Sequence, residues 1–401
     1  MESNSEQEIA LSSERKNRIL LVTNIPTPYR IPLFNELKEQ LERKGLGLKV
    51  VFGALGYARR KWAVDMSQCK FEYEALPSKN LCYSDSEKSS FTYSGLYRVI
   101  SQENPSVIIT NAFSIATTKI WLRSWFKKTD YIIWSGAIRR KDKSDSFVRR
   151  IQRKVLIRRA VGFIAYGTRA KEYLVSLGAK RDKVKIGINT VDAQFYRGEC
   201  RRLRENLIPS DGQKHLLYVG HLCPRKNVLR VLKVINHLAK LRSDVILDIL
   251  GDGADRVRLE EYVTENRLID FVKFHGFKQK ADVSLFLAQS DCFLFQTDFD
   301  IWGLVLVEAM SAGLPCIASI HAGATNDLIK DGVTGFAMDF SETEKVAERI
   351  NGILENPELS KEIGQNASRF IAENVSIEKS AAGFVRGITK TLEGLDDAYI
   401  K

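Results

Sequence analysis

The sequence of 401 residues has few of the features that mark secreted or membrane-spanning proteins. No run approaches about 18 consecutive apolar residues, so we expect no helix that crosses a bilayer. The polar first seventeen residues lack the cationic start and apolar stretch of a secretion signal. The cysteines form no CxxC pair, which argues against a disulfide framework or a thiolate zinc site: Cys69, Cys82, Cys200, Cys223, Cys292 and Cys316. We therefore expect a cytoplasmic protein, either free or peripheral on the inner face of the membrane.

Composition and charge further restrict the kind of protein and its partners. Hydrophobic residues make up 44% of the chain and charged residues 27%, close to globular averages, which excludes disordered and collagen-like chains. Lys and Arg number 61 against 49 Asp and Glu, which gives a net charge of +12. This excess favours an anionic partner, whether nucleic acid, acidic lipid or a phosphorylated small molecule.

Short β-branched runs alternate with helical periodicities along most of the chain. This alternation predicts an α/β protein with two doubly wound, Rossmann-like domains whose strand ends face a cleft. A polar, arginine-rich stretch interrupts the alternation and indicates a linker. We expect a loose tail over 1–17, an N-terminal domain over 18–197, a linker over 198–214, a C-terminal domain over 215–375, and a helix over 376–401 that packs back toward the N-terminal domain.

The segment from Asp298 to Pro315 contains the most informative chemistry. A turn at Gly303 lets the backbone approach a ligand, and the helix that follows offers unpaired amides and a favourable dipole to phosphate oxygens. Glu308 lies on the second turn of that helix, so Asp300 and Glu308 can flank one ligand. The alternative is that Asp300 is a helix-entry acid and Glu308 a solvated residue, although the apolar neighbours of Glu308 disfavour it.

A second segment, from Leu217 to Asn227, indicates a buried strand that runs into a glycine turn and a basic helix start. Lys226 or Arg225 can neutralise a diphosphate there. The alternative is that both are surface charges before a helix. A further glycine turn, from Leu247 to Gly253, recurs in most α/β proteins and is weak evidence.

Together these segments resemble the family 4 glycosyltransferases of GT-B fold. The resemblance rests on ordered motifs: Gly220 with Lys226-Asn227, Asp300-x-Trp302-Gly303 with Glu308-Ala309-Met310, Gly313-Leu-Pro315, and Asp331 to Phe336. It implies a retaining, hexosyltransferase-type transfer from a nucleotide-sugar donor without a metal ion or other cofactor. The second domain would hold the donor, and the first would choose a glycan or lipid-linked acceptor.

The resemblance also implies roles for single residues. Asp300 and Lys226 would be catalytic, Asp300 by holding sugar hydroxyls and Lys226 by stabilising the leaving phosphate. Glu308 would hold the ribose hydroxyls, and the amides from Trp302 to Val305 the diphosphate. The donor site would comprise Gly220, His221, Arg225, Lys226, Phe277, Asp300, Trp302, Gly303, Leu304, Val305 and Glu308. The acceptor side would include Thr27, Tyr29 and Arg30.

Several positions depart from the family pattern. Asp300 stands where the family usually has the first of two glutamates, which leaves the sugar preference open. His221 stands where arginine is common, and it either contacts a phosphate or is merely hydrogen-bonded. All five histidines follow residue 214, so the family's first-domain histidine is missing. Asp298-Phe-Asp300 also spells the DxD metal signature of the other major glycosyltransferase fold, but the helix terminus and Lys226 already supply positive charge, so we expect no metal site.

Ten basic residues against two acidic ones lie between Arg139 and Arg159. Apolar residues recur at helical spacing among them, which predicts a basic amphipathic helix: Phe147, Val148, Ile151, Val155 and Leu156. We expect a membrane patch that rests on anionic headgroups, formed by Arg149, Arg150, Arg153 and Lys154. The alternative is that the apolar stripe packs into the domain and the bases are solvated. Nucleic acid is not expected, because no nucleic-acid module is recognised.

The leading hypothesis is a glycosyltransferase that builds a surface polysaccharide or glycolipid. One alternative is a sugar-nucleotide epimerase on a similar two-domain scaffold, which would need no acceptor. Another is a catalytically inactive nucleotide-sugar-binding protein, suggested by the missing histidine and by the aspartate at position 300.

Overall fold

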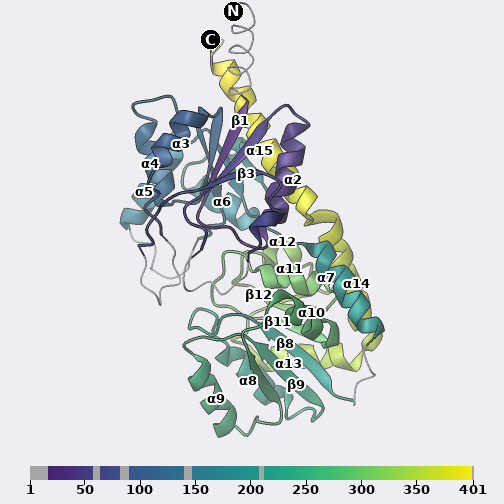
Figure 1. The fold of residues 1–401 in the computed structure, drawn as a ribbon. Helices are drawn as coiled ribbons and strands as arrows, with labels where there is room; N and C mark the ends of the chain where they lie inside the picture. Colours follow the sequence, from purple (N-terminus) through teal and green to yellow (C-terminus); the bar gives the residue numbers. More distant parts are fainter. Residues whose placement is uncertain (1–16, 57–63, 82–89, 140–146, 207–211, 400–401) are drawn as a thin grey trace, which may run out of the picture. The chain divides into compact units, whose positions relative to one another are not determined.

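A computed structural model describes residues 17–56, 64–81, 90–139, 147–206 and 212–399 (Figure 1). The chain divides into two compact units. Unit 1 comprises Met1–Ile188 and Ile377–Lys401, and unit 2 comprises Asn189–Ser376. Residues 1–16 of the expected tail lie outside the described residues.

Unit 1 is built on a seven-stranded parallel sheet with the order β3-β2-β1-β4-β5-β6-β7. Its central strands are continuous apolar runs buried on both faces, as parallel strands covered by helices on both sides must be. The strands are β1 (Arg18–Thr23), β2 (Gly47–Phe52), β3 (Glu72–Ala75), β4 (Val107–Asn111), β5 (Tyr131–Ser135), β6 (Gly162–Ala165) and β7 (Val184–Ile186).

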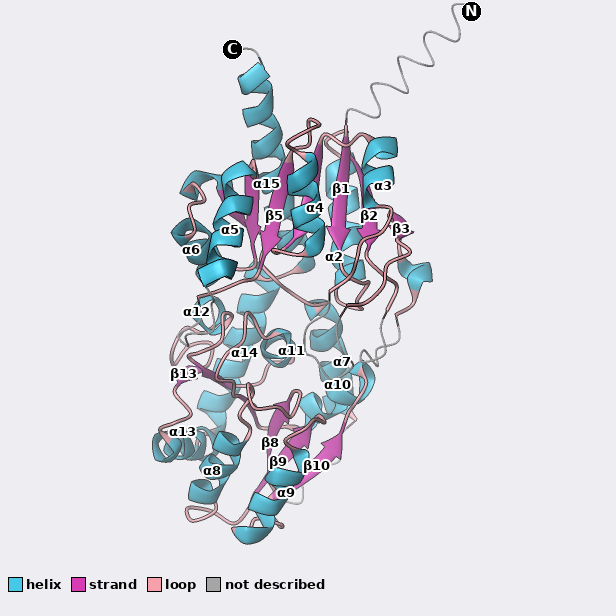
Figure 2. Cartoon of the chain, turned by 90° about the vertical axis from the view of Figure 1, so that its left-hand side faces the viewer, coloured by secondary structure: helices cyan, strands magenta, loops and turns pink. Residues whose placement is uncertain are grey.

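Helices cover the sheet of unit 1 (Figure 2). Those that connect the strands are α2 (Arg30–Glu42), α3 (Leu96–Glu103), α4 (Ile115–Arg123), α5 (Phe147–Arg159) and α6 (Thr168–Ser176), with the short 3-10 helices η1 (Met66–Gln68) and η2 (Arg181–Lys183). The last helix, α15 (Ile377–Tyr399), lies against α2, β6 and β7. Its Phe384 side chain is fully buried, 5.0 Å from Trp134 between ring centres.

Unit 2 has a six-stranded parallel sheet with the order β10-β9-β8-β11-β12-β13. The strands are β8 (Lys214–Val219), β9 (Val245–Leu250), β10 (Val272–Gly276), β11 (Cys292–Phe295), β12 (Cys316–Ser319) and β13 (Phe336–Met338). The helices are α7 (Ala193–Glu205), α8 (Leu229–Leu238), α9 (Arg256–Glu265), α10 (Lys280–Gln289), α11 (Leu304–Ser311), α12 (Thr325–Leu328), α13 (Thr343–Glu355) and α14 (Pro357–Asn374). One apolar core joins the central strands to α8 and α13.

The expected linker over 198–214 is wrong, because most of its described residues belong to α7 and β8 of unit 2. Asp192 caps the helix by accepting from the Phe195 amide, and Cys200 is fully buried against α10. Arg204 donates to backbone carbonyl oxygens of unit 2 instead of facing solvent alone. Unit 2 therefore begins at Asn189, before the expected start at residue 215; residues 207–211 lie outside the described residues.

The amphipathic helix expected before Arg159 corresponds to α5, but its apolar residues do not all face the core. Phe147 is 78% exposed, Val148 74% and Ile151 44%, whereas Leu156 and Ile157 are buried. Residues 140–146 of the basic stretch lie outside the described residues. Among the helices that the structure describes, none combines the length and apolarity needed to cross a membrane.

Candidate functional site

The sheet of unit 2 reverses its strand order between β8 and β11, which pair with each other at its centre. β9 and β10 extend the sheet beyond β8, and β12 and β13 extend it beyond β11. Ligands of open parallel sheets bind outside the carboxyl ends of the two strands at such a switch point. The segments that leave these ends start at Gly220 and Gln296, so they define the candidate site.

The start of α11 offers three consecutive backbone amides. Gly303 precedes the helix with φ of 110°, and a Cβ at this position would lie 2.1 Å from the Phe295 ring, so glycine is required. Within the described part of the chain, the N–H groups of Gly303, Leu304 and Val305 have no hydrogen-bond acceptor. Unpaired amides at the positive end of a helix dipole form an anion site.

Lys226 and Asp300 form a buried ion pair beside these amides. The Lys226 Nζ lies 2.6 Å from Asp300 Oδ2 and 5.3 Å from the centre of the Phe295 ring. Arg225 Nη1 lies 3.6 Å from the same carboxylate oxygen and donates to the Phe299 carbonyl. Burial raises the pKa of Asp300, but the charge and hydrogen bond of Lys226 outweigh it and hold that pKa below its ordinary value.

The other Asp300 oxygen accepts a hydrogen bond from the Trp302 amide at 3.2 Å. The Trp302 N–H is therefore not available to a diphosphate, and the expected set of amides from Trp302 to Val305 is reduced to those of Gly303, Leu304 and Val305. The Trp302 side chain is buried, and its indole N–H has no partner among the described residues. Asp300 and Trp302 thus fix the turn that presents the three remaining amides.

Asp298, the first acid of the DxD sequence, is held by other side chains. Its oxygens accept from Asn227 Nδ2 at 2.7 Å and from Gln296 Nε2 at 3.1 Å. Arg230 Nη1 lies 3.5 Å from Asp298 Oδ1. Within the described residues, the carboxylates of Asp298 and Asp300 therefore bind different basic or amide side chains.

Glu308 meets side chains from two other helices of unit 2. Burial raises its pKa to about 7, although a hydrogen bond with Tyr196 of α7 and the charge of Lys280 of α10 oppose the shift. Burial also lowers the pKa of Lys280, whose Nζ lies 3.6 Å from the centre of the Phe195 ring. A carboxyl group poised near neutral pH follows from this environment.

Two glycine turns pack directly on each other at the end of β8. A Cβ on Gly251 would lie 1.8 Å from the Gly220 carbonyl oxygen, and one on Gly253 would lie 2.1 Å from that of Leu222. The His221 Nδ1 donates to the Asp252 carbonyl at 2.5 Å, which anchors one turn to the other. The glycine turn after β9, weak evidence in sequence, therefore shapes the turn at Gly220.

The structure brings some predicted donor-site residues together and leaves others apart. Arg225, Lys226, Asp300 and Trp302 share contacts, and Gly303 packs against the same Phe295 ring as Lys226. Phe277 follows the edge strand β10 and is 42% exposed, two strands away from β8.

Tyr196 and Lys280 were not predicted as site residues. Tyr196 precedes the segment taken for a linker, and no motif flanks Lys280. Only the packing of α7 on α11, and of α10 on α7, shows the link to Glu308.

The predicted acceptor-side residues lie in unit 1, after β1 and beside β4, where that sheet reverses its order. Arg30 is 8% exposed; its guanidinium carbon lies 4.2 Å from the centre of the Trp134 ring, and Nη2 donates to the Tyr166 hydroxyl at 2.9 Å. Thr27 is buried, and its hydroxyl has no partner among the described residues. Tyr29 is half-buried, with its ring 5.3 Å from the Arg30 guanidinium carbon.

Part of this chain is similar to a known protein family. Residues 201–370 match the model of the family "Glycosyl transferases group 1". That range includes the donor-site segments around Lys226, Asp300, Gly303 and Glu308, and it supports a glycosyltransferase of GT-B fold.

Curated relatives match about half of the chain. N-acetyl-alpha-D-glucosaminyl L-malate synthase of Bacillus anthracis is 29% identical over 194 residues, 48% of this chain and 49% of that protein. Alpha-D-kanosaminyltransferase of Streptomyces kanamyceticus is 28% identical over 192 residues, 48% of each protein. The chain thus spans about half the length of the curated relatives it matches.

Solved structures extend the likeness to both units. HepE of Anabaena in complex with UDP has a TM-score of 0.72 and 20% identity, covering 93% of this chain and all of that one. Sucrose-phosphate synthase of Thermosynechococcus elongatus has a TM-score of 0.74 and 17% identity, covering 94% of this chain and all of that one. At these identities the likeness concerns the fold, and it confirms the predicted class: two Rossmann-like α/β domains of GT-B type.

Proposed function

We propose that the protein is a retaining glycosyltransferase that moves a hexosyl group from a nucleotide-sugar to a glycan or lipid-linked acceptor, in surface polysaccharide or glycolipid synthesis. The observation that carries the proposal is the anion site made by the unpaired amides of Gly303, Leu304 and Val305 beside Lys226. A helix terminus and an ammonium group, packed on one aromatic ring, suit a diphosphate.

The roles follow from the contacts of each group. The three amides and Lys226 bind the diphosphate, and they stabilise the negative charge that grows on it as the sugar leaves. Asp300, ionised through its pairing with Lys226, accepts hydrogen bonds from the sugar hydroxyls. Glu308 accepts from the ribose hydroxyls, and Phe277 lies on the side of the base. Gly220 with His221 and Arg225 completes the turn that borders the phosphates.

The transfer proceeds on one face of the sugar. The bond from the anomeric carbon to the phosphate oxygen breaks, and a bond from the acceptor oxygen forms on the same side. The departing phosphate takes the acceptor's proton, so the step needs no protein base or metal ion. Arg30, Thr27 and Tyr29 of unit 1 hold the acceptor.

Relatives and structural neighbours support a nucleotide-sugar as donor. The two curated relatives are an N-acetyl-alpha-D-glucosaminyl L-malate synthase and an alpha-D-kanosaminyltransferase. Structures of HepE were solved with UDP and with UDP-glucose. For this chain the uridine nucleotide is therefore the first donor to test.

We also propose that α5 docks unit 1 on an anionic membrane. Arg150 and Lys154 are exposed, and they stand among the exposed apolar residues Phe147, Val148 and Ile151. Basic and apolar side chains mixed on one exposed helix match a headgroup region better than water. Arg153 contributes less than the sequence indicates, because it hydrogen-bonds to Tyr173.

The proposal is tested by incubating the purified protein with UDP- and GDP-sugars in EDTA and following nucleotide release and product anomer by NMR. We expect transfer or slow donor hydrolysis, and Lys226→Ala should lower kcat/KM by about 30- to 1000-fold, a loss of about 2 to 4 kcal/mol. Lys233→Ala, an exposed lysine on α8, is the matched control.

Other outcomes point to the alternatives. Sugar interconversion without acceptor would identify an epimerase, and donor binding without turnover for any acceptor would identify an inactive binder. Activity restored only by a divalent ion would contradict the metal-independent step.

A further inference from the structure

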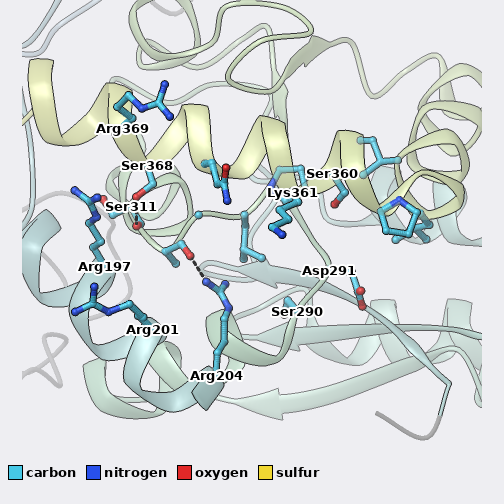
Figure 3. Close-up of a pocket in the computed structure, with 18 of the residues that line it drawn as sticks. Arg197, Arg201, Arg204, Ser290, Asp291, Ser311, Ser360, Lys361, Ser368 and Arg369 are labelled. Carbon is cyan, nitrogen blue, oxygen red and sulfur yellow. Dashed lines mark hydrogen bonds between the residues drawn. The ribbon is translucent and has the colours of Figure 1, made fainter. Parts of the chain in front are cut away.

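A cationic cavity lies in unit 2, at the end of the sheet opposite to the proposed donor site. Its volume is about 680 Å³. It is bordered by α7, by α14 and by the residues that lead into β8, β11 and β12 (Figure 3). These residues stand at the amino ends of the strands, whereas the donor site lies at the carboxyl ends.

The lining is strongly basic. One acidic side chain, Asp291, lines the cavity against six cationic ones: Arg197, Arg201, Arg204, Lys214, Lys361 and Arg369. Two of the six have internal roles, since Arg204 donates to the Ala312 carbonyl at 2.6 Å and Lys214 lies 3.4 Å from Asp291. The side chains of the other four make no hydrogen bond or ion pair within the described part of the chain.

Unpaired like charges around one cavity repel each other, which disfavours the folded state unless an anion binds there. Guanidinium groups grip phosphates with two parallel hydrogen bonds, and ammonium groups add point charge. Ser360 and Gln365 of α14 add neutral hydrogen-bonding groups to the wall. A cavity of this volume falls within the range of about 300 to 1,000 Å³ that holds small molecules.

We propose that this cavity binds a small metabolite with two or more phosphate groups. Cationic side chains face the cavity from both α7 and α14, so separate phosphate groups of one molecule can each meet cations of a different wall (Figure 3). The concave shape and the polar side chains favour a soluble molecule over a flat membrane surface. The chemistry is shared by organic bisphosphates and by inorganic polyphosphate.

Helices α7 and α11 connect the cavity to the proposed donor site. An anion bound in the cavity therefore regulates the donor site. Arg197 lines the cavity, and its neighbour Tyr196 hydrogen-bonds with Glu308. Ser311 and Ala312 line the cavity at the end of α11, whose first residues offer the diphosphate amides. An anion that draws α7 and α14 together changes the packing around Glu308. This regulatory half rests on the proposed function; the binding half does not.

The first experiment measures binding by calorimetry with inorganic tripolyphosphate and with fructose 1,6-bisphosphate, in saturating UDP so that the donor site is filled. The triple variant Arg197→Gln/Arg201→Gln/Lys361→Gln should bind at least tenfold more weakly than the unmodified protein. The control Lys233→Gln/Lys240→Gln/Arg258→Gln removes the same charge from exposed residues of unit 2 outside the cavity, and it should bind normally.

Each outcome decides whether the cavity binds such a metabolite. Equal losses of affinity in the two triple variants would overturn the binding half. A further titration with sulfate, which carries a single anionic group, would overturn it as well if sulfate bound as tightly as tripolyphosphate. Tighter binding of the bisphosphate would assign an organic metabolite, and tighter binding of tripolyphosphate an inorganic polyphosphate. If UDP fails to bind, the same titrations are made with Lys226→Ala, whose donor site is disabled. Binding to the cavity is then measured separately from any failure of the proposed function.

The second experiment measures the UDP dissociation constant with and without tripolyphosphate. We expect a change of at least threefold in the unmodified protein and in the control variant, and none in the cavity variant. An unchanged constant in a protein that binds tripolyphosphate would overturn the regulatory half. Equal changes in all three proteins would mean direct competition at the donor site and would overturn it as well.

Discussion

Glu308 shows how one carboxyl group can be kept close to its titration point. Its backbone belongs to an apolar helix, with Val307 and Ala309 fully buried on either side. Removal from water favours the neutral acid, while Tyr196 and Lys280 favour the carboxylate. The balance places the pKa near 7 in the folded protein, against an ordinary value of 4.5.

This shift makes stability depend on pH in a defined direction. Between about pH 4.5 and 7 the folded state binds a proton at Glu308 that the unfolded state has lost, so the contribution of this residue falls as pH rises and is constant above 7. Glu308→Gln removes the dependence while keeping a hydrogen-bonding group for Tyr196. We expect the variant to gain up to about 3 kcal/mol relative to the unmodified protein between pH 4.5 and 7.5.

Denaturant unfolding of unit 2 at half-unit pH steps measures this gain. Glu261→Gln changes an exposed glutamate of α9 and serves as the matched control, with a difference from the unmodified protein that stays flat across the range. An equally flat difference for Glu308→Gln would show that its carboxyl group titrates like an ordinary one.

At the scale of elements, α5 leaves most of its apolar side chains exposed. Only Leu156 and Ile157 are buried along its thirteen residues. Its end lies beside further exposed aromatic surface, since the Arg159 guanidinium carbon is 4.7 Å from the centre of the Trp125 ring. Trp125 is 60% exposed and Phe126 86%. Exposed apolar side chains that gather in one patch are a mark of protein or membrane interaction sites.

The α5 proposal predicts separate electrostatic and apolar contributions to vesicle binding. Arg150→Gln/Lys154→Gln should weaken binding to vesicles rich in phosphatidylglycerol by about 1 kcal/mol per charge, roughly 30-fold in total. Phe147→Ser/Val148→Ser should weaken binding even at high salt, where charge is screened. Lys44→Gln/Lys180→Gln alters two exposed lysines elsewhere in unit 1 as a control. Sedimentation with vesicles decides: if the α5 variants and the control bind alike, α5 has no membrane role.

The sequence predicts those helices and strands whose formation depends on local residue patterns. Continuous apolar runs gave the central strands, and the turn before α11 was predicted from Gly303 alone. Helix α7 was missed because its many arginines resemble a polar linker, and the carbonyl groups that accept from Arg204 lie 84 and 108 residues away in the sequence. The link between Tyr196 and Glu308 was hidden for the same reason: it exists only once α7 packs on α11.

At the scale of the whole molecule, the chain leaves unit 1 after β7, builds unit 2 and returns to unit 1 through α15. The return is sterically specific. A Cβ on Gly187 would lie 2.7 Å from the Phe384 ring, and one on Gly162 would lie 2.2 Å from Thr391 Oγ1. Because α15 fills the core of unit 1 from the far end of the sequence, unit 1 is formed by two separate stretches of chain, whereas unit 2 is one continuous stretch.

Two mutations in the C-terminal part of the sequence should therefore destabilise different units. Phe384 lies in the C-terminal part of the chain but is buried in unit 1, so Phe384→Ala should destabilise unit 1 by about 3 to 5 kcal/mol and leave unit 2 unchanged. Phe340→Ala, an equally buried residue of unit 2, should do the reverse. Calorimetric unfolding with and without UDP, which stabilises only the unit that binds it, assigns each transition. If Phe384→Ala lowered the UDP-sensitive transition instead, α15 would belong to the core of unit 2.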